Sequence, residues 1–257
     1  MIIENFGSGP RCAEALRLLI GADTDDRLPK AVKRTVLLPV PTSRDKAHIS
    51  GTDKLLCEVF GEVGAGDFVA GYGIDDDAKR IMQERGALVY DALCDEKFLS
   101  DNAELTAVGA LGYILSSAET APIDTRFAIV GYGRIGSRLV RLLLFLGASV
   151  KVYSGTRRSC IELGECGVDA YYIDRDSPIP TSGADIIINT APRDLSSSFS
   201  CGKVPSGVRV IELASGENFK GIEGIERLPG IPDKFYGRSA GRAYYLRIMN
   251  YLCEVTK

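Results

Sequence analysis

The chain has 257 residues, with 31 Lys plus Arg against 34 Asp plus Glu and a formal net charge of −3. That length allows one large domain or two modest ones, at about 150 residues per domain. The charge balance gives no basic excess to neutralise phosphates, so nucleic acid is not an expected partner. No apolar stretch approaches the roughly 20 residues that span a bilayer, and the first ten residues do not resemble a signal peptide. We therefore expect a soluble, cytoplasmic protein without a membrane association.

Cysteine and histidine usage limits the chemistry of the chain. There are seven cysteines, no C-x-x-C pair and a single histidine, His48, which predicts reduced thiols. Because these residues are not clustered, we expect no metal site. The sequence also has no G-x-S-x-G and no Walker A motif, so the usual hydrolase triads and P-loop chemistry lack parts.

Short apolar runs alternate with helical patterns, which predicts α/β units on parallel sheets. In the first part of the chain, strands are expected at 36–40, 68–72 and 87–90. A helix over 75–85, with Gly86 at its end, is expected between the second and third of them. A long connecting helix is expected over 101–119, where apolar residues recur at helical spacing.

The second part runs strand, glycine turn, helix and strand within one continuous stretch. The strands are expected at 127–130 and 149–153, with a helix from 135 to 146 closed by Gly147. Further strands are expected at 170–172, 186–189, 208–213 and 226–228, and a last helix at 238–256. The predicted fold is α/β with two domains: a doubly wound Rossmann sheet and a smaller flavodoxin-like N-terminal domain. We expect domains at 1–102 and 103–237, and a helix at 238–257 that returns to the first domain.

Gly131, Gly133 and Gly136 form the sequence G-Y-G-R-I-G between the predicted strand and helix. The first glycine permits a tight turn, the second lets a diphosphate approach the backbone, and the third lets the helix lie close to the strand. Unpaired N–H groups at the helix start, around Arg134 and Ile135, would then hold the phosphate charge. The strand–turn–helix–strand context favours dinucleotide binding over a plain glycine-rich turn.

The end of the second strand distinguishes NAD from NADP. An Asp or Glu about 20 residues after the first glycine would bind the ribose 2′-hydroxyl of NAD. This chain instead has Ser154, Thr156, Arg157 and Arg158 there, which offer hydroxyls and two guanidiniums to a 2′-phosphate. One good arginine contact favours NADP by about tenfold to a hundredfold. We predict NADP(H), the alternative being an ordinary basic surface loop.

The loop after the strand at 186–189 is the remaining candidate for cofactor contact. Thr190, Ala191 and Pro192 follow that strand, at the carboxyl end of the sheet where open α/β folds bind ligands. They could line a nicotinamide pocket, although a plain strand-ending turn explains them nearly as well.

Several short blocks accompany the glycine turn: LLPVP (37–41), LTAVGA (105–110), INTAP (188–192), VIELAS (210–215) and LPGIPDK (228–234) leading to SAG (239–241). In these blocks and their order, the chain resembles the A subunit of dipicolinate synthase from spore-forming bacteria, over most of its length from about Val36 onward. The resemblance is most specific in the last two blocks and in the Thr-Ala-x-Gly-Ala segment (106–110). Three features depart from the pattern of the family. The first strand and its turn, at 1–9, look truncated, Val108 stands where the family tends to have Glu, and the sequence at 237–239 is Gly-Arg-Ser where the family has Pro-Lys-Thr.

The resemblance implies a subunit that works with a flavoprotein B subunit in dipicolinic acid biosynthesis during sporulation. The reaction would remove a hydride and a proton from a dihydrodipicolinate-type ring bearing two carboxylates, driven by aromatisation. Because Arg suits bidentate and Lys single contacts with carboxylates, we expect substrate-binding residues among the candidates that follow, each of which could equally be a solvated loop residue. They are Thr42, Ser43, Ser215, Lys234, Arg238 and Ser239.

Two other functions are kept as alternatives. The organisation also resembles D-2-hydroxyacid dehydrogenases, but these need a late His paired with a carboxylate, and no His follows His48. His48 itself is interpreted as a surface residue. A non-catalytic NADP(H)-binding or regulatory subunit is the second alternative, since no acid or base is evident. The proton-transfer residue and a homo-oligomeric state are left open.

Overall fold

The computed structural model describes residues 1–25, 27–174, 177–199 and 201–256. The chain divides into two compact units: unit 1 is Met1–Leu105 with Pro232–Lys257, and unit 2 is Thr106–Ile231. Each unit has one parallel sheet, so the predicted α/β fold with two domains is confirmed. The expected domain ends at 102 and 237 compare with unit ends at 105 and 231.

Unit 1 contains a four-stranded parallel sheet in the order β1-β2-β3-β4. Alternate residues of its strands enter two separate cores: Leu37 and Phe68 face one layer, Val36 and Val69 the other. This period of two is what a sheet buried on both faces requires. The elements are β1 (Ile2–Asn5), α1 (Pro10–Thr24), β2 (Arg34–Leu37), α2 (Leu56–Gly61), β3 (Asp67–Gly71), α3 (Asp76–Glu84), β4 (Leu88–Asp91), the start of α4 (Glu96–Ser116) and nearly all of α7 (Ile231–Val255).

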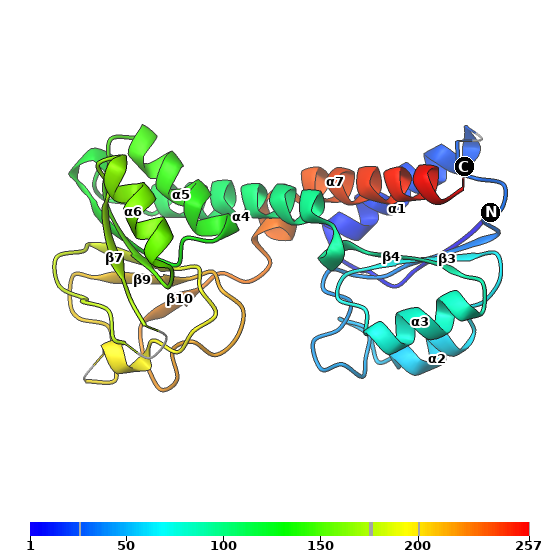
Figure 1. The fold of residues 1–257 in the computed structure, drawn as a ribbon, viewed down its shortest axis with the longest axis horizontal. Helices are drawn as coiled ribbons and strands as arrows, with labels where there is room; N and C mark the ends of the chain where they lie inside the picture. Colours follow the sequence, from blue (N-terminus) through cyan, green and yellow to red (C-terminus); the bar gives the residue numbers. More distant parts are fainter. Residues whose placement is uncertain (26, 175–176, 200, 257) are drawn as a thin grey trace. The chain divides into compact units, whose positions relative to one another are not determined.

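Helices cover both faces of the unit 1 sheet. Helices α1 and α7 pack on one face and α2 and α3 on the other (Figure 1). The connections β1-α1-β2 and β2-α2-β3 step in the same direction across the sheet, but their helices lie on opposite faces. The two connections therefore have opposite handedness, although crossover connections between parallel strands are almost always right-handed. A flavodoxin-like sheet, of order 2-1-3-4-5, gives this arrangement when its second strand is missing. Among the described residues, no strand separates α1 from β2, whereas β1 and its turn are present.

Several predicted boundaries in unit 1 were wrong. The connecting helix begins at Glu96 and not at 101, because the Asp95 carboxylate accepts the N–H groups of Lys97 and Phe98 and so starts the helix. The strand predicted at 36–40 is β2, which begins at Arg34 and ends at Leu37, before the cis Val40–Pro41 bond. The last helix begins at Ile231 and is interrupted by non-helical dihedrals at Tyr236. Helices α1 and α2 were not predicted.

Unit 2 contains a six-stranded parallel sheet in the order β10-β9-β8-β5-β6-β7. Renumbered from β5, this is the Rossmann order 3-2-1-4-5-6, with the switch in strand order between β5 and β8. Helices α4, α5 and α6 cover one face, and Leu195, Phe199 and Phe219 from loops cover the other. The elements are β5 (Arg126–Val130), α5 (Arg134–Phe145), β6 (Ser149–Ser154), α6 (Arg157–Glu165), β7 (Asp169–Tyr172), β8 (Ile186–Asn189), β9 (Arg209–Glu212) and β10 (Ile225–Arg227).

Two further findings concern the whole described chain. All seven cysteines lie in described residues and all are free thiols. None of the described helices is both long and apolar enough to cross a membrane.

Candidate functional site

The glycine turn joins β5 to α5 at the point where the strand order of unit 2 reverses. Gly131 has φ +93°, a conformation that L side chains rarely adopt, and a Cβ there would lie 2.8 Å from Thr190 Oγ1 and 2.9 Å from Ala191 Cβ. At Gly136 a Cβ would overlap the carbonyl oxygen of Gly131. The helix therefore starts directly against the end of the strand, which only glycine permits at these two positions.

Gly133 behaves differently from the other two glycines. A Cβ there would meet nothing within 4 Å, and Gly133 is the N-cap residue of α5 without any side-chain cap. The backbone is thus open where the first N–H groups of the helix lack intrahelical partners. The three glycines form a cradle that fits a diphosphate at a helix N-terminus. Arg134 and Ile135 are the first two residues of that helix.

The end of β6 places the second predicted group next to the turn. Ser154 is buried and its Oγ accepts a hydrogen bond from the Thr156 N–H (3.2 Å). Arg157 begins α6, and its guanidinium lies 4.3 Å from the centre of the Tyr172 ring. Arg158 instead forms an ion pair with Glu162 (2.7 Å). Of the two arginines, Arg157 is the one held at the edge of the sheet.

A cavity of about 500 Å³ lies beside the glycine turn and the end of β6. It is lined by Gly131, Gly155, Ala191 and Pro192, and also by Tyr172 and Asp174, which sequence patterns did not single out. The Tyr172 hydroxyl donates to the Asp174 carboxylate (2.6 Å), which raises the pKa of the phenol. Tyr172 ends β7, the neighbour of β6 in the sheet, and that position is the signal that could have identified it.

The loop after β8 is fixed to the glycine turn. Thr190 Oγ1 donates to the carbonyl oxygens of Val130 (3.0 Å) and Gly131 (3.1 Å), so its hydroxyl positions the turn. One residue earlier, the buried Asn189 amide donates to both carboxylate oxygens of buried Glu212 (3.1 and 3.2 Å). Burial raises the pKa of Glu212, against the opposite effect of the Asn189 hydrogen bond.

The predicted substrate-binding residues fall in both units. Ser215 follows β9 in unit 2 and is exposed, whereas the other five belong to unit 1. Thr42 is buried, and its Oγ1 accepts the Tyr72 N–H (2.7 Å). Ser43 Oγ donates to Asp45 (3.2 Å). The exposed residues Lys234, Arg238 and Ser239 lie in α7.

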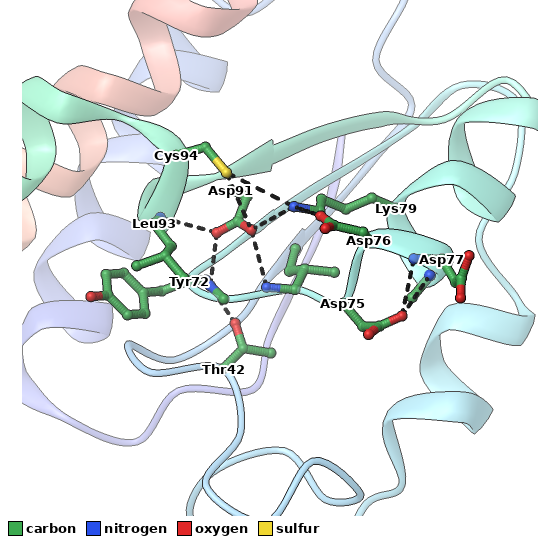
Figure 2. Close-up of polar contacts among 12 residues, drawn as sticks. Thr42, Tyr72, Asp75, Asp76, Asp77, Lys79, Asp91, Leu93 and Cys94 are labelled. Atoms are coloured by element: carbon green, nitrogen blue, oxygen red, sulfur yellow. Dashed lines mark hydrogen bonds and ion pairs between the residues drawn. The ribbon is translucent and has the colours of Figure 1, made fainter. Parts of the chain in front are cut away.

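The carboxyl edge of the unit 1 sheet also carries a charged cluster centred on Asp91, at the end of β4 (Figure 2). Its buried carboxylate accepts N–H groups from Gly73 (2.7 Å), Ile74 (3.2 Å) and Leu93 (3.0 Å), and pairs with Lys79 (3.1 Å). Every acceptor direction of Asp91 is thereby used. The cluster holds two loops together and so has a structural role.

Comparison with solved structures identifies the architecture. The fold is similar to that of dipicolinate synthase A chains. The A chain from Bacillus subtilis matches with a TM-score of 0.71 and 16% identity over 99% of this chain and 95% of that one. Its counterpart from Bacillus halodurans matches with a TM-score of 0.72 and 19% identity over 97% of both chains. A D-2-hydroxyisocaproate dehydrogenase matches with a TM-score of 0.53 and 12% identity over 99% of this chain and 96% of that one.

These likenesses extend over both units but concern the fold. The sequence matches no family model, and no curated protein is similar to it at a significant level. The structural resemblance to dipicolinate synthase A chains that the sequence blocks predicted is confirmed. The D-2-hydroxyacid dehydrogenases that were also considered from the sequence have a related fold.

Proposed function

We propose that the chain is an NADP(H)-dependent oxidoreductase subunit that acts on a small cyclic dicarboxylate of the dihydrodipicolinate type. The observation that carries this proposal is the glycine cradle at the switch point of the unit 2 sheet. The next strand, β6, ends at Ser154 without an acid, and Arg157 begins the helix that follows it. The substrate class rests on the fold likeness to dipicolinate synthase A chains over nearly the full length.

The preference for NADP is supported by the position of Arg157. Its guanidinium lies over the Tyr172 ring, and that ring lines the cavity beside the glycine turn. A stacked guanidinium keeps its edge N–H groups for a 2′-phosphate. Arg158 is engaged by Glu162, so we assign it a smaller part, with Ser154 and Thr156 as neutral donors.

The bound nicotinamide would accept a hydride from the substrate. The chain's own residues do the rest: the N–H groups at the start of α5 hold the diphosphate, and the loop 190–192 lies against the cradle. The arginine, lysine and hydroxyl candidates named from the sequence would bind the substrate carboxylates. We further propose a flavoprotein partner, in the cytosolic synthesis of dipicolinic acid during sporulation.

Calorimetry with NADPH and NADH tests the cofactor assignment. We expect NADPH to bind more tightly to the wild-type chain. R157A should lower NADPH affinity by about tenfold to a hundredfold without changing NADH affinity, because only the 2′-phosphate contact is lost. R158A, the matched control, should have a smaller effect. The proposal is overturned if neither NADPH nor NADH binds.

Turnover assays then test the reaction. The purified chain is given a dihydrodipicolinate-type substrate and NADP⁺, with and without a flavoprotein partner. Turnover that requires the partner supports a synthase subunit. NADPH binding without any turnover would favour a non-catalytic, NADP(H)-sensing subunit, and oxidation of a 2-hydroxy acid by the chain alone would favour a dehydrogenase.

A further inference from the structure

The cavity beside the glycine turn, hereafter the β7 pocket, has a lining that a diphosphate alone does not explain. Its volume of about 500 Å³ lies within the range of small-molecule pockets, which are mostly apolar with a few polar groups. Val130, Tyr153 and Ile173 contribute buried apolar surface from the ends of three neighbouring strands. Gly155 leaves the backbone open, since a Cβ there would meet nothing within 4 Å. The pocket therefore suits a flat, largely apolar group next to the glycine turn.

Arg193 ties together the two loops that form the walls of the β7 pocket. Its Nη2 donates to the carbonyl oxygens of Asp174 (2.8 Å) and Ser177 (2.7 Å), which follow β7. Its backbone N–H donates to the carbonyl oxygen of Ala191 (2.9 Å), which follows β8. The Asp174 carbonyl oxygen also accepts the Ser177 N–H (3.1 Å). The side chain of Asp174 is therefore presented to the pocket from a fixed backbone.

Asp174 is the only acid among the described residues that line the β7 pocket. The Tyr172 hydroxyl donates to Asp174 Oδ1 (2.6 Å) and so orients the carboxylate. The other oxygen, Oδ2, has no hydrogen-bond partner within the described part of the chain. Because an ionised carboxylate only accepts hydrogen bonds, Oδ2 selects a ligand group that carries an N–H or O–H.

The proposed cofactor brings such a group to this pocket. With its diphosphate at the start of α5 and its 2′-phosphate at Arg157, the adenosine ribose of NADP(H) lies between Gly131 and the end of β6. The Arg157 guanidinium lies 4.3 Å from the centre of the Tyr172 ring, and that ring lines the pocket. The base on this ribose therefore has the β7 pocket beside it. Adenine is flat, and its 6-amino group is the one hydrogen-bond donor on its edge.

We propose that the β7 pocket binds the adenine ring of NADP(H), that the Asp174 carboxylate accepts a hydrogen bond from the 6-amino group, and that Tyr172 positions this carboxylate. The inference deepens the proposed function and rests on it. Tyr172 then has two roles, since its ring holds Arg157 and its hydroxyl holds Asp174. A cation binds the 2′-phosphate and an acid binds the base, so the same edge of the sheet selects both the phosphorylation of the ribose and the identity of the purine.

Calorimetry with NADPH and with its hypoxanthine analogue tests this assignment, because hypoxanthine has an oxygen in place of the 6-amino group. We expect wild type to bind NADPH about tenfold more tightly, since the analogue sets two acceptors against each other. In D174N, Tyr172 still donates to Oδ1 and the side-chain NH₂ faces the base, so the preference should disappear or reverse. D169N is the matched control: it removes a carboxylate at the other end of β7, outside the pocket lining, and should keep the wild-type ratio.

Y172F separates the two roles of Tyr172. It keeps the ring under Arg157 and removes the hydroxyl, so the preference for NADPH over the hypoxanthine analogue should weaken while the preference for NADPH over NADH is retained. A hydroxyl with a purely structural role would instead weaken the binding of all three nucleotides equally.

The outcomes separate this inference from the proposed function. If wild type binds NADPH and the hypoxanthine analogue equally, or if D174N keeps the wild-type ratio, Asp174 does not contact the base and the inference is overturned. The NADP(H) assignment stands in both cases, because NADPH still binds. If no nucleotide binds to wild type, the proposed function fails and the inference fails with it.

Discussion

The two outer glycines of the cradle give a sharp test, because they differ from the middle one in what a methyl group would meet. In G136A the new Cβ would overlap the Gly131 carbonyl oxygen and lie 2.9 Å from Thr190 Oγ1. Helix propensity alone favours alanine by about 1 kcal/mol, whereas overpacking costs about 1–3 kcal/mol. We expect a net loss of up to about 2 kcal/mol, which at 2–4 °C per kcal/mol lowers Tm by up to roughly 8 °C. NADPH affinity should fall too, because α5 moves away from the strand.

G133A is the matched control, since its Cβ would meet nothing within 4 Å. We expect its Tm to change little, while NADPH binding weakens by about tenfold or more, because the methyl group stands where the diphosphate approaches the backbone. Thermal melts followed by circular dichroism and calorimetry with NADPH separate the two effects. An unchanged Tm in G136A would refute the packing reasoning. Unchanged NADPH affinity in G133A would refute the phosphate cradle.

Three further predictions concern stability, each measured by chemical denaturation. D91N should lose about 1–3 kcal/mol, since it weakens the hydrogen bonds of a buried carboxylate and its ion pair with Lys79, whereas D76N, which changes the exposed partner of the same lysine, should leave the midpoint unchanged. Glu212 has a raised pKa, so the folded state binds more protons than the unfolded state; the stability of the wild type should fall relative to E212Q as pH rises above the ordinary range of glutamate, and then level off. G241A, whose Cβ would lie 2.5 Å from a carbonyl oxygen of α1, should lose about 1–3 kcal/mol, whereas G164A, with nothing within 4 Å, should gain up to about 1 kcal/mol.

Local signals in the sequence predicted those elements whose ends are set by local chemistry. The apolar run 186–189 is strand β8 with the same bounds. Helix α3 is capped by the Asp75 carboxylate, which accepts the N–H groups of Asp77 and Ala78, and it is followed by Gly86 at φ +87°. The glycine turn lies between strand and helix as its motif requires.

One local signal was missed. The start of α4 is set by a side-chain cap at Asp95, earlier in the chain than the aspartate that the pattern favoured, and Asp101 instead pairs with Lys97 (2.7 Å). Features set by tertiary structure could not be predicted. In the described residues, unit 1 lacks the strand that a flavodoxin-like sheet has beside β1. This difference can be recognised only from which face of the sheet each helix covers. Tyr172 joins the candidate site through strand order, which a linear pattern does not contain.

Structural and functional polar groups in this fold differ in whether their hydrogen bonds are already made within the chain. Asp91 and Glu212 both lie at carboxyl ends of strands, but each spends its carboxylate on groups of its own chain, so neither can bind a ligand without breaking those bonds. The backbone at Gly133 is open, because a Cβ there would meet nothing within 4 Å. Breaking the hydrogen bonds of a satisfied buried group costs about 1–3 kcal/mol before any ligand is bound, so we expect binding where hydrogen-bonding capacity is unused. In unit 2 that place is the glycine cradle.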